Sequence, residues 1–114
     1  MDCLFCKIGA GDIASETFFE DGYVKIFKDI HPKAPVHLLV IPKTHIQSIA
    51  HLEVDHSDII VKLMYAAKDY AARIGLRGYK LVFNVGREGG QVIDHLHLHI
   101  LGGWGQSNER TINL

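Results

Sequence analysis

Four short runs of the chain have the residue types and spacing of β-strands. They lie at 17–20, 23–28, 36–41 and 79–85, and β-branched, aromatic and other apolar side chains are frequent in each. Asp21-Gly22 stands between the first two runs, where this dipeptide is a strong signal for a β-hairpin. The pattern therefore predicts a sheet that opens with a hairpin.

One longer segment has helical periodicity. Between 55 and 74, apolar side chains recur at steps of three and four residues, which places them on one face of an α-helix. Asp55 or Ser57 can cap the start of this helix and Gly75 its end. Residues 1–15 predict only a helical turn and a loop. One long helix covers one face of a sheet, so we expect the other face to be free for a site.

The segment 95–101 alternates polar and apolar residues, with His95, His97 and His99 separated by leucines. Side chains of a strand point to opposite faces in turn, so a strand here would place three imidazoles on one face. His95 and His99 would then lie about 13 Å apart, which is too far for both to bind one zinc ion. The three histidines must therefore differ in role, or two neighbours bind metal while the third does something else.

These elements together predict an α+β domain, with a five-stranded antiparallel sheet and one long helix. The chain has 114 residues, of which 47% are hydrophobic, so it has room for a single domain over 1–114 with a real core. The residues after the histidine strand, 102–114, have no periodicity and are expected to form a tail. In this tail, Trp104 is expected to pack against this chain or a partner.

The charge balance excludes a broad electrostatic surface. The chain has 12 Lys and Arg against 13 Asp and Glu, which does not favour nucleic acid or anionic lipid as a partner. No apolar run approaches the roughly 20 residues that span a bilayer, and the first residues do not resemble a signal peptide. We therefore expect a soluble cytoplasmic protein that binds neither nucleic acid nor membrane, and any phosphate binding must be local.

The only two cysteines, Cys3 and Cys6, form a Cys-x-x-Cys pair. In a reducing compartment this spacing indicates metal binding or redox chemistry before it indicates a structural disulfide. Two idle thiols are a further alternative that the spacing leaves open.

The histidine segment also supports a family resemblance. A half-buried strand with inactive histidines would explain one isolated histidine, but three in alternation beside the glycine-rich turn 86–91 favour a functional row. His95-Leu96-His97-Leu98-His99-Ile100-Leu101 matches the pattern His-φ-His-φ-His-φ-φ, and the chain resembles a small nucleotide-binding member of the histidine triad family. The resemblance runs from about residue 3 to residue 103. The further matching segments are Ala34-Pro35-Val36-His37, Val40-Ile41-Pro42-Lys43, Gly90-Gln91 and Gly102-Gly103, the last of which is typical of the phosphoramidase branch.

The resemblance implies an enzyme that hydrolyses a nucleoside 5′-phosphoramidate to a nucleoside monophosphate and an amine. His97 would be the nucleophile, because a neutral imidazole has the lone pair needed to attack the α-phosphorus. The resulting nucleotidyl-histidine would be hydrolysed by water. His99 would protonate the leaving group or hydrogen bond the phosphoryl oxygens, and His95 would flank the nucleophile on its other side. His37, on a strand that we expect to lie beside the histidine strand, resembles the additional family histidine that supports the nucleophile, with a satisfied core histidine as the alternative.

The same resemblance implies a purine nucleotide site. Asp29 matches the carboxylate that accepts the ribose hydroxyls, and the turn at Gly90 and Gln91 looks like a phosphate cradle, since glycine lets N–H groups approach an anion. Val92 stands where the family usually has a serine that hydrogen bonds the leaving side. Asp94 stands where an aromatic residue is common, so we expect the approach to the three histidines to be more acidic than usual. Four residues resemble the apolar slot that holds the base, with core packing as the alternative: Phe5, Ile8, Phe27 and Ile30. Asn84 matches a polar contact near the phosphate.

A structural zinc site is implied by similarity to several bacterial relatives. Cys3, Cys6, His45 and His95 match its ligands, and four is the number that a closed zinc site needs. Such a site has no open position for substrate, so we expect it to tie down the N-terminus and to take no part in the chemistry. The resemblance further implies a homodimer whose sheets join across the long helix and a strand.

Two other functions stay open from the sequence. A zinc hydrolase would use two of the three histidines as ligands and a metal-bound water as the nucleophile. A nucleotide-binding regulatory protein would bind purine nucleotides with little turnover, because Val92 lacks the usual hydroxyl.

Overall fold

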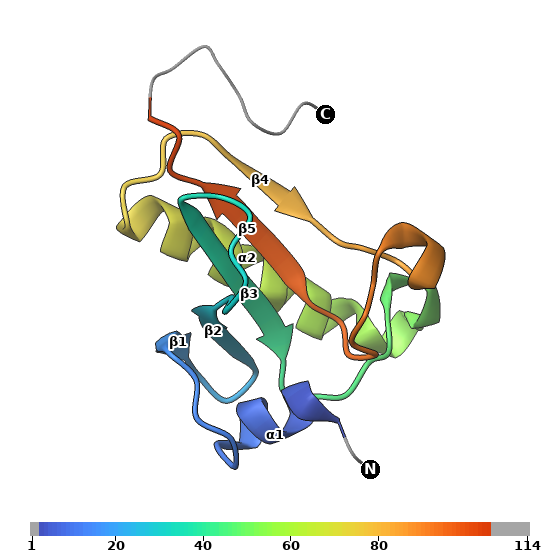
Figure 1. Ribbon diagram of the computed structural model, residues 1–114. Coiled ribbons are helices and arrows are strands. Elements are labelled where there is room, and N and C mark those ends of the chain that lie inside the picture. Colours follow the sequence, from blue (N-terminus) through green and yellow to red (C-terminus); the bar gives the residue numbers. More distant parts are fainter. Residues whose placement is uncertain (1–2, 106–114) are drawn as a thin grey trace.

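A five-stranded antiparallel sheet with one long helix against it forms the centre of the fold, as the sequence predicted (Figure 1). The computed structural model describes residues 3–105. β3 and β5 are distant in sequence but pair in the middle of the sheet, whose order is β1-β2-β3-β5-β4. The strands are β1 (Thr17–Glu20), β2 (Val24–Lys28), β3 (Val36–Pro42), β4 (Tyr79–Val82) and β5 (Leu98–Gly102).

The long helix α2 (Ser57–Arg73) lies within the predicted segment. It begins at Ser57 because a 3₁₀ turn, Val54–His56, occupies the residues before it, so neither Asp55 nor Ser57 is the N-cap. Gly75 follows the helix with a φ of 83°, a left-handed conformation that glycine adopts at low cost. The N-terminal segment forms a seven-residue helix, α1 (Leu4–Ala10), rather than a single turn. The two remaining 3₁₀ turns are Ile49–His51 and Arg87–Gly89.

The two faces of the sheet carry separate apolar cores. Along β3, Leu38 and Val40 belong to the large core that includes Leu63 and Ala67 of α2. Leu39 and Ile41 belong to a smaller core on the other face, which includes Phe5, Ile8 and Cys3 from the N-terminal segment. Figure 1 shows α2 behind the sheet and α1 at the lower end of the other side. The second face is therefore partly covered by α1, and the histidine row lies on what remains.

The histidine strand is shorter than predicted. β5 begins at Leu98 rather than at residue 95, because the segment before it pairs with the chain that follows β3 instead of extending the ladder. The N–H of Leu96 donates to the carbonyl of Ile46 at 2.6 Å. The alternation nevertheless extends beyond the strand, since Leu96 and Leu98 are both buried in the core beneath α2. β4 also ends early, at Val82 rather than at residue 85.

No helix within residues 3–105 is long and apolar enough to cross a membrane. Trp104 is half-buried. The rest of the expected tail, from residue 106 onward, lies outside the described residues.

Candidate functional site

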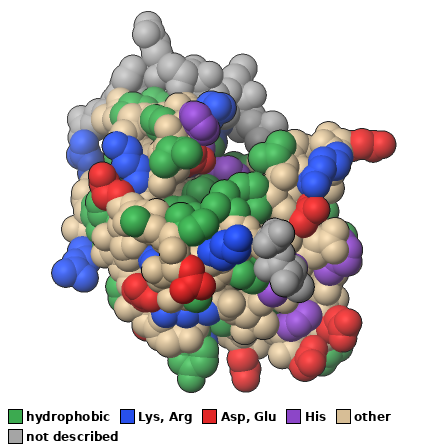
Figure 2. All heavy atoms as spheres, turned by 60° about the horizontal axis from the view of Figure 1, so that its bottom comes forward, with side chains coloured by type: hydrophobic (Ala, Val, Ile, Leu, Met, Phe, Trp, Pro, Cys, Tyr) green, Lys and Arg blue, Asp and Glu red, His purple; other side chains and the backbone are tan. Residues whose placement is uncertain are grey.

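The pairing of β3 with β5 brings a fourth histidine to the row. His37 stands opposite Leu101 in this pair, as expected from the prediction that its strand lies beside the histidine strand. The ring centroids of His37 and His99 are 5.1 Å apart, and those of His97 and His99 are 5.0 Å apart. Figure 2 shows histidine side chains within a hollow of this face, beside gathered hydrophobic side chains. The row is thus a cluster of imidazoles in partly apolar surroundings.

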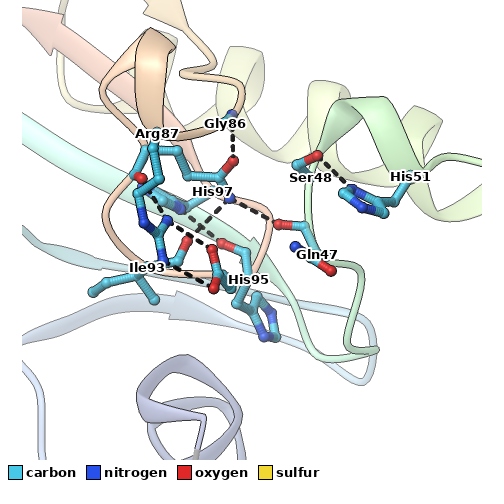
Figure 3. A network of polar contacts seen from close by, with 10 residues as sticks. Gln47, Ser48, His51, Gly86, Arg87, Ile93, His95 and His97 are labelled. Atoms are coloured by element: carbon cyan, nitrogen blue, oxygen red, sulfur yellow. Dashed lines mark hydrogen bonds and ion pairs between the residues drawn. The ribbon is translucent and has the colours of Figure 1, made fainter.

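A backbone carbonyl fixes the proton on His97. The Nδ1 of His97 lies 2.7 Å from the carbonyl oxygen of His95, a contact drawn in Figure 3. A carbonyl can only accept, so Nδ1 carries the hydrogen and Nε2 keeps its lone pair. Burial lowers the pKa of His97, which keeps the ring neutral near pH 7. His97 therefore has the protonation state of a nucleophile.

On His99 the ring hydrogen is on Nε2, not on Nδ1 as in His97, and a backbone amide determines this through His37. The N–H of Lys33 donates to Nδ1 of His37 at 2.9 Å, so the hydrogen of neutral His37 is on Nε2. This Nε2–H donates to Nδ1 of His99 at 2.8 Å, which leaves the hydrogen of His99 on Nε2. Burial, reinforced by the neighbouring His97 and His37, lowers the pKa of His99 to about 4. His99 is therefore a neutral ring that presents an N–H, not a lone pair, on its Nε2 side.

The third member of the row, His95, belongs to a different cluster. Its Nε2–H donates to the carbonyl of Pro42 at 2.8 Å, so its Nδ1 has a lone pair. This Nδ1 lies 3.3 Å from Sγ of Cys3, 3.5 Å from Sγ of Cys6 and 3.2 Å from Nδ1 of His45. The side chain is fully buried. Its ring thus faces the cysteines, while its carbonyl orients His97.

Cys3, Cys6, His45 and His95 fit a tetrahedral metal ion. Both cysteines are free thiols, and the four ligand atoms lie within 4.8 Å of one another. At zinc distances of about 2.0–2.1 Å to nitrogen and about 2.3 Å to sulfur, tetrahedral ligands stand about 3.3 to 3.8 Å apart. The measured separations are close to these values. The hydrogen bond from His95 to a carbonyl is also the usual outer contact of a metal-binding histidine. These residues could therefore hold a metal.

A second group, Asp29, His37 and His99, also brings ligand atoms within 4.8 Å but does not fit a cation. Nε2 of His37 lies 3.3 Å from Oδ2 of Asp29 and points toward His99. Because the amide of Lys33 occupies the other nitrogen, this Nε2 carries a hydrogen and has no lone pair for a metal. A metal-bound water among the row histidines, as a zinc hydrolase would need, is therefore not supported at this group.

The residues predicted for the nucleoside are only partly together. Phe5, Ile8 and Phe27 pack in one buried cluster, with the rings of Phe5 and Phe27 edge to face at 5.5 Å. Ile30 is outside this cluster and 84% exposed. Asp29 is half-buried at the end of β2, and its Oδ1 accepts from the N–H of His31 at 2.8 Å.

The glycine-rich turn differs from the predicted phosphate cradle. The N–H groups of Gly89 and Gln91 donate to the carbonyl of Gly86, and that of Gly90 donates to the carbonyl of Arg87. The turn therefore uses internally the donors that were expected to bind an anion. Gly90 has a φ of 90°, which explains the glycine. Asn84, the other predicted phosphate contact, lies with Nδ2 3.5 Å from Nε2 of His99.

Gln91 has a structural role that the sequence did not reveal. Its side chain is 2% exposed, accepts from the N–H of Gly86 at 3.0 Å and donates to the carbonyls of Gln47 and Ile93 at 2.8 and 3.0 Å. Figure 3 shows this network between the turn and the segment that follows β3. The side chain of Gln91 therefore fixes the turn, and the expectation that it contacts the nucleotide finds no support in this arrangement.

Asp94 does not make the approach to the row more acidic, contrary to expectation. The guanidinium of Arg87 donates to its two carboxylate oxygens at 2.8 and 3.0 Å and holds the pKa of Asp94 below its usual value. Val92 is 76% exposed next to this ion pair. A cavity of about 290 Å³ lies behind the turn and does not include the row histidines; its lining is Gln47, Ser48, His51, Gly86, Arg87, Gln91 and Asp94.

Three features of the site were missed from the sequence. The carbonyl of Pro42 and the amide of Lys33 set the ring hydrogens, and backbone groups of this kind leave no residue-type signal. The third is the ring of Phe5, which meets His97 edge-on with centroids 5.1 Å apart. Phe5 lies between Cys3 and Cys6 in the sequence, and the expected metal site brings both cysteines next to His95. The contact between Phe5 and His97 could have been inferred from this.

The chain is similar to known proteins over nearly its whole length. Residues 2–112 match a family model described as "Scavenger mRNA decapping enzyme C-term binding". The chain is 46% identical over 102 residues to Protein HitA of Neisseria gonorrhoeae (89% of this chain, 95% of that protein). It is 35% identical over 104 residues to the purine nucleoside phosphoramidase of Escherichia coli (90% of this chain, 87% of that protein). The structure of a HIT family hydrolase from Legionella pneumophila superposes with a TM-score of 0.88 at 48% identity, covering 90% of this chain and 93% of that one.

Proposed function

The chain belongs to the histidine triad (HIT) family, which includes hydrolases, and from this premise we propose that it is a purine nucleoside phosphoramidase. It would hydrolyse the P–N bond of a nucleoside 5′-phosphoramidate, releasing the nucleoside monophosphate and an amine. The similarity to the Escherichia coli phosphoramidase supports the substrate class. The observation that carries the chemistry is the hydrogen bond from Nδ1 of His97 to the carbonyl of His95, because it leaves a lone pair on Nε2.

The first step forms a bond between Nε2 of His97 and the α-phosphorus as the P–N bond breaks. The electron pair of the broken bond stays on the leaving nitrogen, which takes up a proton and departs as an amine. Water then attacks the phosphorus of the nucleotidyl-histidine, the bond from phosphorus to Nε2 of His97 breaks, and the proton that the water loses would return to His99. The nucleoside monophosphate is released, and His97 returns to its neutral form. The neutral state of His97, set by burial, makes the lone pair available without prior deprotonation.

His99 would supply the proton. Without a phosphate beside it, His99 is neutral, with a pKa of about 4, and presents Nε2–H. A bound anionic phosphate would raise this pKa, since a nearby negative charge favours the protonated ring. His99 would then hydrogen bond the phosphoryl oxygens before the step and protonate the leaving group during it. His37 orients His99, and His95 orients His97.

The nucleoside would bind beside α1 and the end of β2. The carboxylate of Asp29 would accept the ribose hydroxyls, with its orientation set by the N–H of His31. The base would cover Ile30, which is an exposed apolar side chain in the ligand-free chain, and lie over the cluster of Phe5, Ile8 and Phe27. The phosphate would approach Asn84, whose Nδ2 lies 3.5 Å from Nε2 of His99, and the exposed Val92.

Two further features belong to this proposal. Cys3, Cys6, His45 and His95 would hold zinc as a structural ion. By linking two thiolates to two imidazoles, this ion would attach the N-terminal segment to the rest of the fold. A homodimer would form through the edge strand β4 and the exposed face of α2, where Val61 and Tyr65 are 53% and 59% exposed. Light scattering tests the dimer, and Tyr65→Glu should shift it toward monomer. The cytoplasmic location also stays a prediction.

The decisive experiment is incubation with adenosine 5′-phosphoramidate. We expect AMP release by the wild type and a loss of at least about 1,000-fold in His97→Ala, the order seen when a covalent nucleophile is removed. His56→Ala, in the turn before α2, is the matched control and should keep the rate. Quenching with base should trap a nucleotidyl group on His97, detectable by mass. A full rate in His97→Ala would overturn the proposal.

The alternative is a nucleotide-binding regulatory protein with little turnover. The observation that favours it is Val92, whose exposed apolar side chain offers no hydroxyl on the leaving side. Tight AMP binding without phosphoramidate hydrolysis would support this alternative. If Val92→Ser then gains activity, the missing hydroxyl is the cause.

A further inference from the structure

We propose that the Cys/His centre, formed by Cys3, Cys6, His45 and His95, positions the reacting imidazole of His97 and is not only an anchor for the N-terminus. The reacting role of His97 rests on the proposed function. The coupling itself rests on one residue, His95, which takes part in both sites. The centre would act on His97 in two ways: through the backbone of His95, and through α1, whose N-terminal end carries Cys3 and Cys6.

The first route is the backbone of His95. Its ring is held by the centre through Nδ1 and by the carbonyl of Pro42 through Nε2, and its own carbonyl accepts from Nδ1 of His97 at 2.7 Å. The segment 95–97 is not part of the β-ladder, because β5 begins at Leu98. Leu96 attaches this segment through its amide and its buried side chain, and the ring of His95 is the attachment nearest to the carbonyl that orients His97. Loss of the ring's partners would let the carbonyl that fixes the proton of His97 move.

The second route is α1. Cys3 and Cys6 flank Phe5, whose ring centroid lies 5.1 Å from that of His97 with the ring planes at 83°. A seven-residue helix is too short to be stable alone, so its attachments decide its position. Its far end is held by Lys25, whose Nζ donates to the carbonyl of Ile8 at 2.8 Å. Its near end is held by the packing of Phe5 against Phe27 and by the two cysteines, so an occupied centre would restrict the position of Phe5 further.

The two routes together confine His97 on two sides. With the centre closed by a metal, the carbonyl of His95 accepts the Nδ1 hydrogen and Phe5 restricts the ring. With the centre open, the near end of α1 and the segment 95–97 each lose one attachment and become less restricted, while Lys25 and the two apolar cores keep the fold. His97 would then populate both tautomers, and the apolar cluster under the base would loosen. His95 and Phe5 are in this sense positioning residues for the nucleophile.

The test uses two substitutions at one position, with zinc as the probe. His45→Ala removes a ligand, whereas His45→Cys keeps four ligands of types that zinc accepts. Zinc content is measured, and the imidazole nitrogens of His97 are followed by ¹⁵N NMR in histidine-labelled protein. We expect zinc-loaded wild type to show a protonated Nδ1 and an unprotonated Nε2. In His45→Ala, and in chelated wild type, both signals should move toward their average, with AMP binding about 10-fold weaker. His45→Cys with zinc should restore the wild-type values.

Three results would overturn the inference. One is a wild-type chain that takes up no zinc. Another is a metal-free chain, folded by circular dichroism, whose His97 signals and AMP affinity match the loaded form within twofold. The third is zinc-loaded His45→Cys that retains the averaged signals.

A further variant keeps the inference testable if His45→Ala does not fold. Phe5→Leu leaves all four ligands in place, so it should bind zinc fully and still move the His97 signals toward the average. Unchanged signals in zinc-loaded Phe5→Leu would contradict the second route. None of the NMR and zinc measurements needs turnover. A chain that shows the coupling but hydrolyses no phosphoramidate would refute the proposed function and leave this inference standing.

Discussion

The two ends of the histidine row have the same side chain but opposite chemistry. At one end, His95 gives its Nε2 hydrogen to the carbonyl of Pro42 and presents a lone pair at Nδ1 among the cysteines. At the other end, His99 accepts at Nδ1 from His37 and presents a hydrogen at Nε2. Neutral imidazole has one donor and one acceptor, so whichever nitrogen the surroundings occupy decides what the other can do. A backbone group assigns each role, directly at His95 through the carbonyl of Pro42, and indirectly at His99 through the amide of Lys33 and the ring of His37.

The middle residue belongs to neither end. His97 gives its Nδ1 hydrogen to the carbonyl of His95, so its lone pair is on Nε2. Along the row the hydrogens therefore alternate between Nε2, Nδ1 and Nε2. The comparison of the ends predicts that substitutions at His99 affect rate, whereas substitutions at His95 affect metal content and stability.

The largest effect is expected for His99→Gln, which should lower the rate of hydrolysis without changing zinc content or stability. Loss of the proton donor should lower the rate of phosphoramidate hydrolysis by about 10²–10⁴-fold, the range typical of general acid catalysis. Zinc content and thermal stability should stay close to wild type, because His99 contacts no residue of the Cys/His centre. Steady-state kinetics and calorimetry on the same preparation test this. A variant that loses zinc along with activity would break the division between the ends.

The reverse result is expected for His95→Ala. This ring is fully buried, so its removal leaves a cavity, leaves the carbonyl of Pro42 unpaired and removes a ligand. We expect a loss of about 3 kcal/mol or more in the free energy of unfolding, which corresponds to a fall in Tm of at least about 12 °C in a domain of this size. His31→Ala, at an exposed histidine, is the control and should change Tm by little. An unchanged Tm with full zinc content would show that His95 does not belong to the centre.

A smaller effect should follow from His37→Asn. Without Nε2–H of His37, the hydrogen of His99 is free to occupy either nitrogen, so part of the population would present no donor to the leaving group. We expect a rate lower by about 10- to 100-fold, as is typical when a residue that orients a functional imidazole is removed. The decrease should be in kcat rather than KM. A rate within twofold of wild type would mean that His99 does not need this partner.

A last prediction concerns the free energy of unfolding as a function of pH. The pKa of His99 is lowered to about 4 in the folded chain, while the unfolded value is near 6.5. Below pH 6.5 the unfolded state therefore binds a proton that the folded state does not, and stability falls as the pH drops from about 6.5 to about 4. Urea unfolding across this range measures the decline. His99→Gln should show a shallower decline than wild type, and an equally steep one would contradict the assignment.

The sequence predicted the architecture well where periodicity is strong. The 3.6-residue pattern of α2 and the Asp-Gly hairpin depend on local spacing, and both are present in the structure. The adjacency of His37 to the histidine row was also predicted correctly, because the two strands could be placed side by side from the family pattern. Strand ends were less accurate. Alternation extends through residues 95–97, but the ladder does not, since hydrogen bonding to the segment after β3 takes its place.

The site itself was harder to predict where backbone groups decide the chemistry. Nothing in the residue types of Lys33 or Pro42 indicates that their backbone groups fix ring hydrogens. The glycine-rich turn suggested an anion cradle, yet its N–H groups close the turn on itself, and the buried amide of Gln91 fixes it from within. Residue-type patterns find which side chains gather, whereas the direction of each donor follows from backbone geometry that only the folded chain defines.

The central claim is the alternation of hydrogens along the row, and ¹⁵N NMR of histidine-labelled protein at pH 7.5 measures it directly. The account predicts that His95 and His99 are protonated on Nε2 and His97 on Nδ1, each in a single tautomer. A His97 ring protonated on Nε2 would have no lone pair for the phosphorus and would contradict the account.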